Sequence, residues 1–319
     1  MHNKKITILL ATYNGGSFLE EQLTSFANQS WVNIDILASD DGSSDNTSEI
    51  LNTWAKNWRK GSFQVMKGPR DGHSENFRHL IQAVSDKKTY VAFSDQDDIW
   101  HRDKLEVAMS KLISMGEDTP VMYCSRTRLV DVDGNPTGLS PLFTNSPSFT
   151  NSLTQSLAGG NTIVFNSAAF SVVRESAMKT KFLHHDWWSY QILMGAGGKV
   201  YYDPKPQIDY RQHQNNVFGK NTGQAAILRR ISGLLSGQYS EWIDSNLLGL
   251  EACHSLLTTD NLNMVRGLQE ARRRGGISCA IFLWKNGIKR QTRMASIGLY
   301  VSVLLRKKSV SFNHARRIN

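Results

Sequence analysis

Three aspartates fall within four residues directly after an apolar stretch, in the segment VAFSDQDDIW at residues 91–100. Asp95, Asp97 and Asp98 repel one another at this spacing, and aspartate is a poor residue for the interior of a strand or helix. Carboxylate oxygens suit Mg²⁺ or Mn²⁺, which bind through one or two carboxylates together with substrate phosphates. A solvated turn, with Asp98 near the start of the next helix, would explain the same residues. The cluster therefore predicts either a divalent cation site or a polar turn at the end of a strand.

A second acidic pair, Asp40 and Asp41, lies in the segment SDDGSSDNT. Aspartate and serine are common helix caps, and Gly42 favours a turn, which gives a purely structural explanation. Alternatively, the two carboxylates accept hydrogen bonds from a nucleotide base or from ribose hydroxyls at a strand end.

Further downstream, Asp186 precedes a short apolar segment that ends in glycines, in FLHHDWWSYQILMGAGG. Its position is typical of a helix N-cap, but Trp187 and Trp188 directly after the carboxylate suggest a sugar platform beside a desolvated base. Arg211 and His213, in YRQHQNNVFG, are candidate phosphate or metal contacts, or residues of a surface turn. None of these residues identifies a reaction by itself.

The polar clusters need a scaffold, and up to about residue 130 the apolar pattern alternates between strand and helix periodicities. The expected strands are ITILLA, IDILAS, FQVM and YVAF, and a helical segment follows each of them. Repeated strand–helix units with apolar strands indicate an α/β fold, with a mostly parallel sheet covered by helices on both faces. Such sheets bind ligands at the carboxyl ends of their strands. The segments TYNGG, SDDGSSD and SDQDD all fall there, so we expect the candidate residues to converge at one edge.

Charge is distributed unevenly along the 319 residues. Residues 1–219 contain 21 Lys/Arg and 23 Asp/Glu, whereas residues 220–319 contain 16 and 5. The pattern beyond residue 130 is irregular, with a hairpin expected at Asp133–Gly134, and from residue 220 it is helical and basic. A basic tail on a nearly neutral domain indicates a polyanionic partner, either nucleic acid or an anionic membrane surface. Three cysteines without a CxxC pair indicate reduced thiols in a cytosolic compartment.

Several classes of protein lack their signatures in this chain. No GxGxxG follows the first strand, and GAGGKV lacks the P-loop spacing, which excludes a dinucleotide dehydrogenase and a P-loop NTPase. The longest apolar run, ASIGLYVSVLL, falls short of the ~18 residues that a membrane-spanning helix requires. The short apolar run near the N-terminus is expected to be a strand, not a signal peptide.

Five segments follow one another in a characteristic order: ATYNGGSFLEEQLTSFANQS, SDDGSSDNT, SDQDDIW, GGNT and HHDWW. Together they resemble the family-2 glycosyltransferases, which have the nucleotide-diphospho-sugar (GT-A) fold, over residues 5–219. GHSENFRHLI and FSDQDDIWHRDKL resemble in particular bacterial rhamnosyltransferases of O-antigen and related polysaccharide assembly. The resemblance implies a catalytic domain at 1–219, with a nucleotide-sugar-binding half at 1–130 and an acceptor half at 131–219. A basic, mainly helical extension at 220–319 follows.

The resemblance also implies a role for each matching residue. Asp97 is the expected ligand of Mg²⁺ or Mn²⁺, with His213 as a further metal contact and Arg211 at the diphosphate. Asp186 matches the aspartate that ends the family's Glu-Asp motif and is the expected catalytic base, although His185 replaces the glutamate before it. The expected donor contacts are Ala11, Tyr13, Asp40, Asp41 and Asp95, and the expected acceptor contacts are Gly160, Asn161, Trp187 and Trp188.

These roles imply a metal-dependent inverting glycosyltransferase. The cation would bridge the phosphates of a nucleotide sugar and stabilise the charge of the leaving group, while Asp186 takes a proton from an acceptor hydroxyl. The resemblance favours dTDP-L-rhamnose as donor, with a UDP-hexose as the alternative, and a saccharide as acceptor. The basic tail would allow the enzyme to reach a lipid-linked form of that acceptor. A nucleotidyltransferase also needs paired aspartates and Mg²⁺, but the chain lacks an early Gly-rich phosphate loop. A non-catalytic membrane-bound scaffold is disfavoured because Asp97 and Asp186 are both present.

The basic tail interleaves Lys and Arg with apolar stretches, CAIFLW and ASIGLYVSVLL, that are too short to span a bilayer. Such segments lie in the membrane interface, so we expect a cytoplasmic protein that is peripheral on the inner face of the cell membrane, with Phe282 and Trp284 inserted. The alternative is a basic helical subdomain that closes the core. Nucleic-acid binding is not expected, since no recognised module is present.

Overall fold

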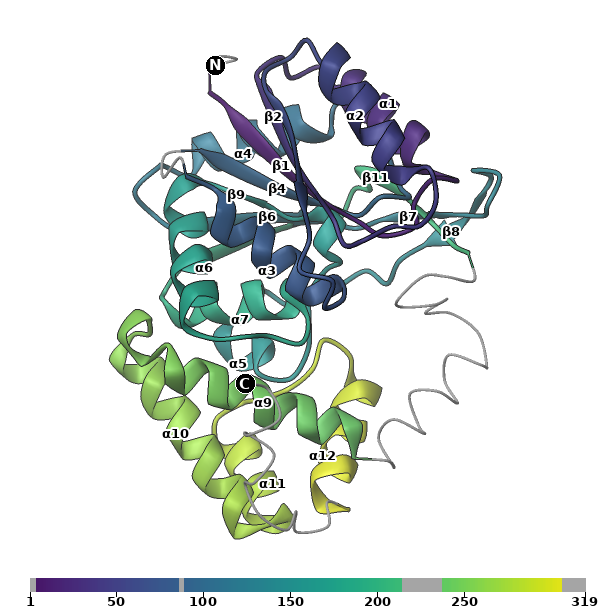
Figure 1. Ribbon diagram of the computed structural model, residues 1–319. Coiled ribbons are helices and arrows are strands. Elements are labelled where there is room, and N and C mark those ends of the chain that lie inside the picture. Colours follow the sequence, from purple (N-terminus) through teal and green to yellow (C-terminus); the bar gives the residue numbers. More distant parts are fainter. Residues whose placement is uncertain (1–3, 86–88, 214–236, 306–319) are drawn as a thin grey trace.

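A seven-stranded sheet runs through the molecule in the order β10-β6-β9-β4-β1-β2-β3 (Figure 1). The computed structural model describes residues 4–85, 89–213 and 237–305. The strands of this sheet are β1 (Ile6–Thr12), β2 (Ile34–Asp40), β3 (Phe63–Lys67), β4 (Tyr90–Ser94), β6 (Val121–Ser125), β9 (Val164–Phe165) and β10 (Lys199–Asp203). β9 pairs antiparallel with β4 and β6, and the other pairs are parallel. The four strands expected from the sequence are therefore confirmed, and the reversed β9 is an addition.

Helices cover both faces of this sheet, as the apolar strands predicted. The first face carries α1 (Leu19–Ala27), α2 (Thr47–Asn57) and α4 (Lys104–Ser114), and the second carries α3 (His73–Ala83), α6 (Ser167–Lys179) and α7 (His185–Gly195). Strand β1 divides its side chains between the two layers, since Ile8 and Leu10 pack with the first set of helices and Leu9 and Ala11 with the second.

A smaller sheet, which the sequence pattern did not predict, has the order β5-β11-β7-β8. Its strands are β5 (Ile99–Trp100), β7 (Arg128–Val130), β8 (Pro136–Leu139) and β11 (Ile208–Arg211). The hairpin expected at Asp133–Gly134 joins β7 to β8, and Gly134 adopts a φ of 85°. Because β11 pairs with β5, the chain around residue 211 lies beside the segment that follows β4.

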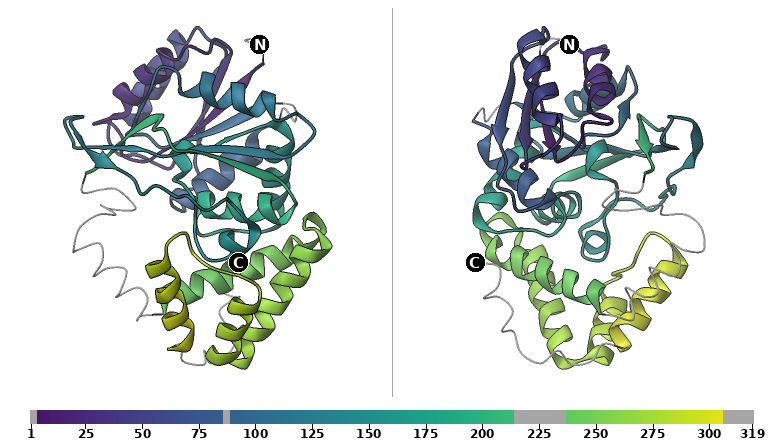
Figure 2. Two further views of the ribbon diagram at one scale, coloured as in Figure 1. Left: turned by 180° about the vertical axis from the view of Figure 1, so that it is seen from behind. Right: turned by 45° about the vertical axis from the view of Figure 1, so that its right-hand side comes forward.

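The described part of the basic extension forms a helical layer at the end of the molecule opposite α1 and α2 (Figures 1 and 2). It consists of α9 (Gln238–Ala252), η2 (His254–Leu256), α10 (Thr259–Arg274), α11 (Gly276–Lys285) and α12 (Arg293–Leu304). It packs against α7 and α5 (Phe149–Ser152), in one continuous hydrophobic core. A short helix, η1 (Gly160–Thr162), precedes β9 in the chain. The remainder of the predicted extension, 220–236 and 306–319, lies outside the described residues. Among the helices that the structure describes, none has the length and apolar character needed to cross a membrane.

Candidate active site

The carboxyl ends of β1, β2 and β4 meet at one edge of the large sheet. Thr12 is paired with Asp40, and Leu10 with Ser94, so the segments that follow these strands are neighbours. The Gln96 side chain joins two of them, because it accepts a hydrogen bond from the Tyr13 N–H (2.8 Å) and donates one to the Tyr13 carbonyl (2.9 Å). The convergence expected from the sequence is thus present.

Two predicted donor contacts lie at the end of β1 and differ in exposure. Ala11 is buried inside the sheet, where it pairs with Ser39. The Tyr13 side chain is 58% exposed, so its ring is free to stack on a planar ligand such as a base.

Asp40 and Asp41 accept hydrogen bonds from neighbouring segments of the chain. Asp40 accepts hydrogen bonds from the hydroxyls of Thr12 (3.2 Å) and Ser48 (2.8 Å). Asp41 accepts hydrogen bonds of 2.6 and 2.9 Å from two backbone N–H groups of the 70–72 turn. These contacts are structural, but they are not the helix caps that the sequence offered as an alternative, since the N-cap of α2 is Asn46. A contact with a nucleotide remains a prediction.

Asp97 forms a close pair with His213. The distance from Asp97 Oδ2 to His213 Nε2 is 2.7 Å, and both side chains are mostly buried. The imidazole stacks on the ring of Phe18, with 4.9 Å between ring centroids. Below the pair, Arg211 Nε donates a hydrogen bond to the Asp97 carbonyl (3.1 Å). A carboxylate and an imidazole are therefore presented side by side at the end of β4.

Asp98 is fully buried and fixes the turn that carries its neighbours. Its carboxylate accepts hydrogen bonds from Asn161 Nδ2 (2.6 Å) and from the Arg211 N–H (3.3 Å), and its own N–H donates to Gln22 Oε1 (2.8 Å). Burial, together with the charges of Asp97 and Asp95, raises the pKa of Asp98 well above its usual range. Asp98 therefore has a structural role, but the solvated turn offered as the alternative is wrong for it, since its side chain is fully buried.

Asp95 contacts a histidine that the sequence reasoning did not select. His73, the first residue of α3, places Nε2 3.1 Å from Asp95 Oδ1, and its ring packs against Phe77 and His185. Burial alone would lower the pKa of His73, but the hydrogen bond to Asp95 and the charges of Asp95, Asp186 and Asp97 outweigh it and raise the pKa. The charges of Asp95 and Asp186 therefore both stabilise the protonated form of His73.

Asp186 lies in the first turn of α7. It accepts hydrogen bonds from the Trp187 N–H (2.7 Å) and from Ser156 Oγ (3.2 Å). Burial raises the pKa of Asp186, although these two hydrogen bonds and the charge of His73 oppose the shift. A carboxylate with a raised pKa is a stronger proton acceptor than an ordinary aspartate.

His185 fills an apolar pocket beside Asp186. Its ring stacks on Phe77, with centroids 3.8 Å apart, and meets Phe93 edge-on. Burial lowers the pKa of His185 well below its usual range, so the ring is neutral. A Cβ on Gly160 would lie only 1.9 Å from His185 Nε2. The predicted acceptor residue Gly160 is therefore a packing partner of the histidine that replaces the family's glutamate.

Asp97 and His213 are suitable protein ligands for a divalent cation that also binds the substrate. In the part of the chain that the structure describes, no group of three or more His, Cys, Asp or Glu side chains could hold a metal ion. Asp97 and His213 supply one oxygen and one nitrogen donor, which Mn²⁺ accepts readily and Mg²⁺ less so. Two protein ligands leave coordination positions for the oxygens of a diphosphate. The residues present are thus compatible with the predicted cation.

Comparison with known proteins decides the family. Residues 7–182 match the family model for glycosyl transferase family 2. The chain belongs to this family. It is 30% identical over 244 residues to the dTDP-rhamnosyl transferase RfbG of Shigella flexneri, which covers 72% of this chain and 80% of RfbG. The predicted family and its resemblance to rhamnosyltransferases are confirmed.

Solved structures show the same fold at low sequence identity. S. aureus TarS 1-349, in complex with UDP-GlcNAc, superposes with a TM-score of 0.52 at 15% identity, covering 88% of this glycosyltransferase and 79% of that chain. The mannosyltransferase PcManGT from Pyrobaculum calidifontis, in complex with GDP-Man and Mn²⁺, gives a TM-score of 0.50 at 13% identity, covering 95% and 85%. The enzyme therefore has the GT-A fold that the sequence predicted.

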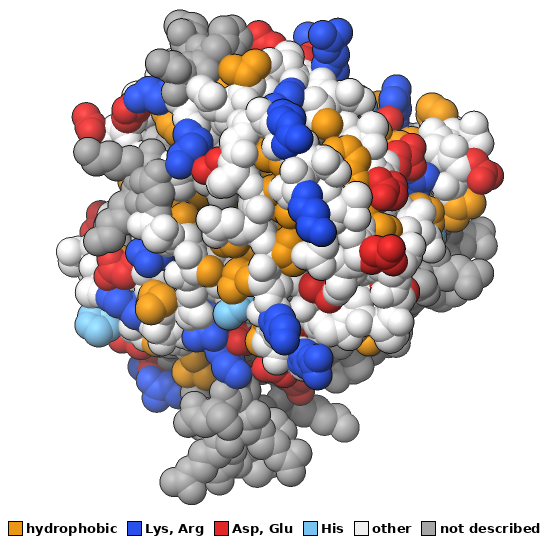
Figure 3. All heavy atoms as spheres, turned by 45° about the horizontal axis from the view of Figure 1, so that its top comes forward, with side chains coloured by type: hydrophobic (Ala, Val, Ile, Leu, Met, Phe, Trp, Pro, Cys, Tyr) orange, Lys and Arg blue, Asp and Glu red, His pale blue; other side chains and the backbone are white. Residues whose placement is uncertain are grey.

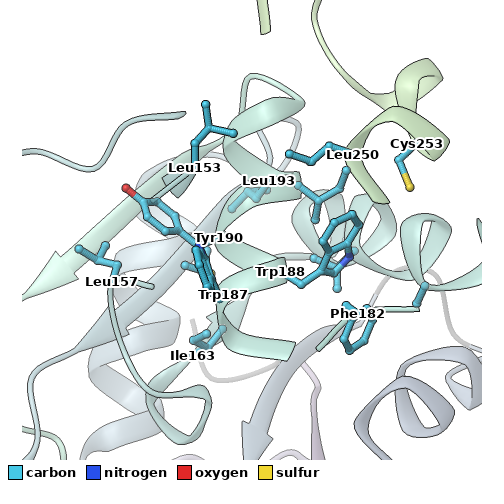
Figure 4. Packing of buried hydrophobic residues seen from close by; sticks show 14 of the residues in the cluster. Leu153, Leu157, Ile163, Phe182, Trp187, Trp188, Tyr190, Leu193, Leu250 and Cys253 are labelled. Carbon is cyan, nitrogen blue, oxygen red and sulfur yellow. The ribbon is translucent and has the colours of Figure 1, made fainter. Parts of the chain in front are cut away.

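The two tryptophans predicted to form an acceptor platform are core residues instead. Trp188 is 1% exposed and donates a hydrogen bond to Ser176 Oγ (2.9 Å), and Trp187 donates one to the Ser152 carbonyl (2.7 Å). Figure 4 shows both rings among aliphatic side chains, with Leu250 of α9 near Trp188. Indole rings that line a buried helix interface gain more from apolar contacts than from solvent exposure. The platform prediction is wrong for these two residues.

Two other predicted contacts are positioning residues in this enzyme. Arg211 is 2% exposed, and its guanidinium donates to Glu21, to the Asp97 carbonyl and to the Val132 carbonyl (2.6 Å). A buried guanidinium with these protein acceptors does not face a diphosphate, which corrects that prediction. Asn161 is buried as well, and it binds Asp98 instead of facing an acceptor.

The sequence analysis missed His73 and Gln96 because the residues that they contact lie far away in the sequence. Gln96 meets Tyr13 across 83 residues, and periodicity carries no information about such a pair. A signal existed for His73, since it lies in GHSEN, part of one segment that resembles rhamnosyltransferases. That segment indicated a subgroup but no role for the histidine.

Proposed function

We propose that this glycosyltransferase transfers L-rhamnose from dTDP-L-rhamnose to a saccharide acceptor in bacterial surface polysaccharide synthesis. The observation that carries this proposal is the 30% identity to RfbG, a dTDP-rhamnosyl transferase, over most of both chains. The low-identity structural neighbours share the fold and do not indicate a donor sugar.

The donor nucleotide would lie at the carboxyl ends of β1 and β2. The exposed ring of Tyr13 is suited to stacking on the base, beside Ala11 at the end of β1. Asp40, Asp41 and Asp95 would contact the ribose and base, with lone pairs that their present hydrogen bonds leave over.

The chemistry would be divided between the two ends of the site. Asp97 and His213 would hold a divalent cation, which when bound supplies positive charge to the diphosphate leaving group. Asp186 would accept the proton of the acceptor hydroxyl, and the raised pKa of its carboxyl suits that task. Arg211 positions Asp97, because its Nε donates a hydrogen bond to the Asp97 carbonyl and its backbone N–H donates one to the neighbouring Asp98 carboxylate. Attack from the side opposite the leaving group would invert the anomeric configuration.

The acceptor is proposed to be a lipid-linked saccharide at the inner face of the cell membrane, with the enzyme in the cytoplasm. Support comes from the strongly basic extension, which packs against the elements that hold Asp186. No nucleic acid is proposed as a partner.

A donor panel tests the proposal. Purified enzyme with Mn²⁺ or Mg²⁺ is incubated with dTDP-L-rhamnose, UDP-glucose, UDP-N-acetylglucosamine and GDP-mannose, and nucleotide diphosphate release is measured with and without a lipid-linked saccharide extract. We expect dTDP release to exceed release from the other donors. Faster turnover of a UDP-hexose would overturn the rhamnose proposal while leaving the family unchanged. The Asp186→Asn variant serves as the blank for uncatalysed hydrolysis.

A further inference from the structure

Helices α11 and α12 each expose a row of large apolar side chains. On α11 the row is Ile277, Ile281 and Trp284, and Ile277 and Trp284 are 72% and 73% exposed. These spacings of four and three residues place all three side chains on one helix face. On α12 the exposed row consists of Met294, Ile297, Val301 and Leu304. We call these seven residues the apolar rows.

The opposite faces of the same two helices fill the core. Cys279 and Leu283 of α11 are buried, as are Leu299 and Val303 of α12. Each helix is therefore apolar on both sides, although only one side packs on the protein. A helix that is apolar all round is normally buried by a partner or a lipid phase.

Phe282 does not belong to the apolar rows, which corrects one expectation from the sequence. Its ring packs against α10, where a Cβ on Gly267 would lie 2.7 Å from Phe282 Cε2. Of the two aromatic residues predicted to insert into a membrane, only Trp284 faces outward.

The start of α11 and the end of α12 lie in close contact. A Cβ on Gly276 would lie 2.3 Å from the Val303 carbonyl oxygen and 3.0 Å from Leu304 Cα. Ile277, the first member of the α11 row, directly follows this glycine. This close contact places Ile277, at the start of the α11 row, near Leu304, at the end of the α12 row.

The charge around the apolar rows is positive. Arg273 and Arg274 precede α11, and Lys285 ends it. Lys289 lies between the two helices, and Arg293 begins α12; all five side chains are exposed. From Arg266 to the end of the sequence there are 13 Lys/Arg residues and a single acid, Glu270. By contrast, the face shown in Figure 3, at the other end of the molecule, mixes side chains of both signs. Apolar rows edged by basic residues match the interface of an anionic bilayer.

We propose that the apolar rows of α11 and α12 are a membrane-docking surface that inserts into the interface of an anionic bilayer. The two helices have 10 and 12 residues, or about 15–18 Å at 1.5 Å per residue, so they can lie in the interface but cannot cross a hydrocarbon core of about 30 Å. A second copy of the chain is a poor occupant, since it would bring the same basic edge against itself.

This surface deepens the proposed function and rests on it for its biological purpose. Docking through α11 and α12 places the helical layer on the membrane, and α7, which begins with His185 and Asp186, packs on that layer. An acceptor linked to a lipid would then be presented to Asp186 from the membrane side. Binding itself needs no sugar donor, so it can be measured separately from activity.

Vesicle flotation of the full-length protein tests the proposal. Vesicles of phosphatidylcholine with 30% phosphatidylglycerol are compared with pure phosphatidylcholine, for wild type, Ile281→Ser/Trp284→Ser and Ile297→Ser/Val301→Ser. The matched control is Met178→Ser, which removes a side chain that is 62% exposed on α6, outside the apolar rows. Because the substituted residues are exposed, thermal unfolding should be unchanged, which separates lost docking from misfolding.

We expect wild type and Met178→Ser to float with anionic vesicles, and each double variant to bind at least about tenfold more weakly. Brominated lipids should quench wild-type fluorescence more than that of Trp284→Phe, which reports insertion of this indole. The proposal is overturned if wild type ignores anionic vesicles, if the double variants bind normally, or if the protein is a dimer that Ile281→Ser/Trp284→Ser dissociates. If the protein docks on vesicles but does not transfer rhamnose, only the proposed function is refuted. If it transfers rhamnose but does not dock, only the proposed membrane-docking surface is refuted.

Discussion

The imidazole of His213 lies 2.7 Å from the carboxylate of Asp97, although 116 residues separate them in the sequence. The pairing of β11 with β5 and β7 produces this contact, since it brings the chain after Arg211 to the turn that follows β4. Asp97 thus follows a strand of the large sheet, and His213 follows a strand of the smaller sheet. The pair is the centre of the proposed cation site.

Asp97→Asn is expected to abolish metal-dependent binding of nucleotide diphosphate and to reduce turnover by about 100-fold or more, because the amide is a neutral and weaker ligand. Calorimetric titration with dTDP in the presence and absence of Mn²⁺ measures the first effect. Asp118→Asn, at an exposed aspartate, is the control. Normal Mn²⁺-dependent binding by Asp97→Asn would rule out this role.

The rate of transfer should fall at acidic pH with a midpoint above the ordinary aspartate pKa of 3.8, since burial raises the pKa of Asp186 and only the ionised form accepts a proton. Ser156→Ala removes a hydrogen bond to the ionised form, which lowers the pKa of Asp186, so this variant should move the midpoint to higher pH. The measurement is kcat against pH, with Ser114→Ala as control. An unchanged midpoint in Ser156→Ala would argue against Asp186 as the base.

Gly160→Ala is expected to destabilise the enzyme by about 1–3 kcal/mol and to reduce activity. The new methyl group collides with His185, whose ring cannot move away because it is stacked on Phe77. Urea unfolding of Gly160→Ala, His185→Ala and the double variant measures the coupling between the two sites. If the steric explanation is right, the second substitution costs less in the presence of the first, whereas additive free energies would contradict it.

Lys104 should make the protein more stable at pH 9 than at pH 7. The side chain is fully buried over the Trp100 ring, and burial lowers the pKa of Lys104 to about 7, although Asp98 opposes this shift. Between this value and the unfolded pKa of 10.5 the unfolded chain binds the extra proton, so the free energy of unfolding rises with pH by about 2 kcal/mol over two units.

Urea unfolding at pH 7 and pH 9 tests this sign. Lys104→Met should lack most of the difference, and Lys111→Met, which removes a lysine from the same helix over the Tyr201 ring, should keep it. Equal pH dependence in wild type and Lys104→Met would show that another group is responsible.

Much of the fold could be predicted from the sequence because its signals are local. The spacing of Leu19, Leu23 and Phe26 predicts a helix that packs on a sheet, and the structure buries all three. Asp95, Asp97 and Asp41 follow apolar strands, and parallel strands bring their carboxyl ends to one edge. The same reasoning predicted the hairpin at Gly134 from its residue type.

What only the tertiary structure decided concerns side chains whose environment comes from distant segments. The sequence placed Trp187 and Trp188 next to a carboxylate, but helix α9 and the residues around Ser152 and Ser176 bury them. Arg211 was expected at a diphosphate, yet its guanidinium is taken up by acceptors on β4–β5, on the β7–β8 loop and on α1. The periodicity of apolar residues indicates which side of a helix or strand is apolar. Whether that side contacts protein, ligand or membrane depends on packing with segments that are distant in the sequence.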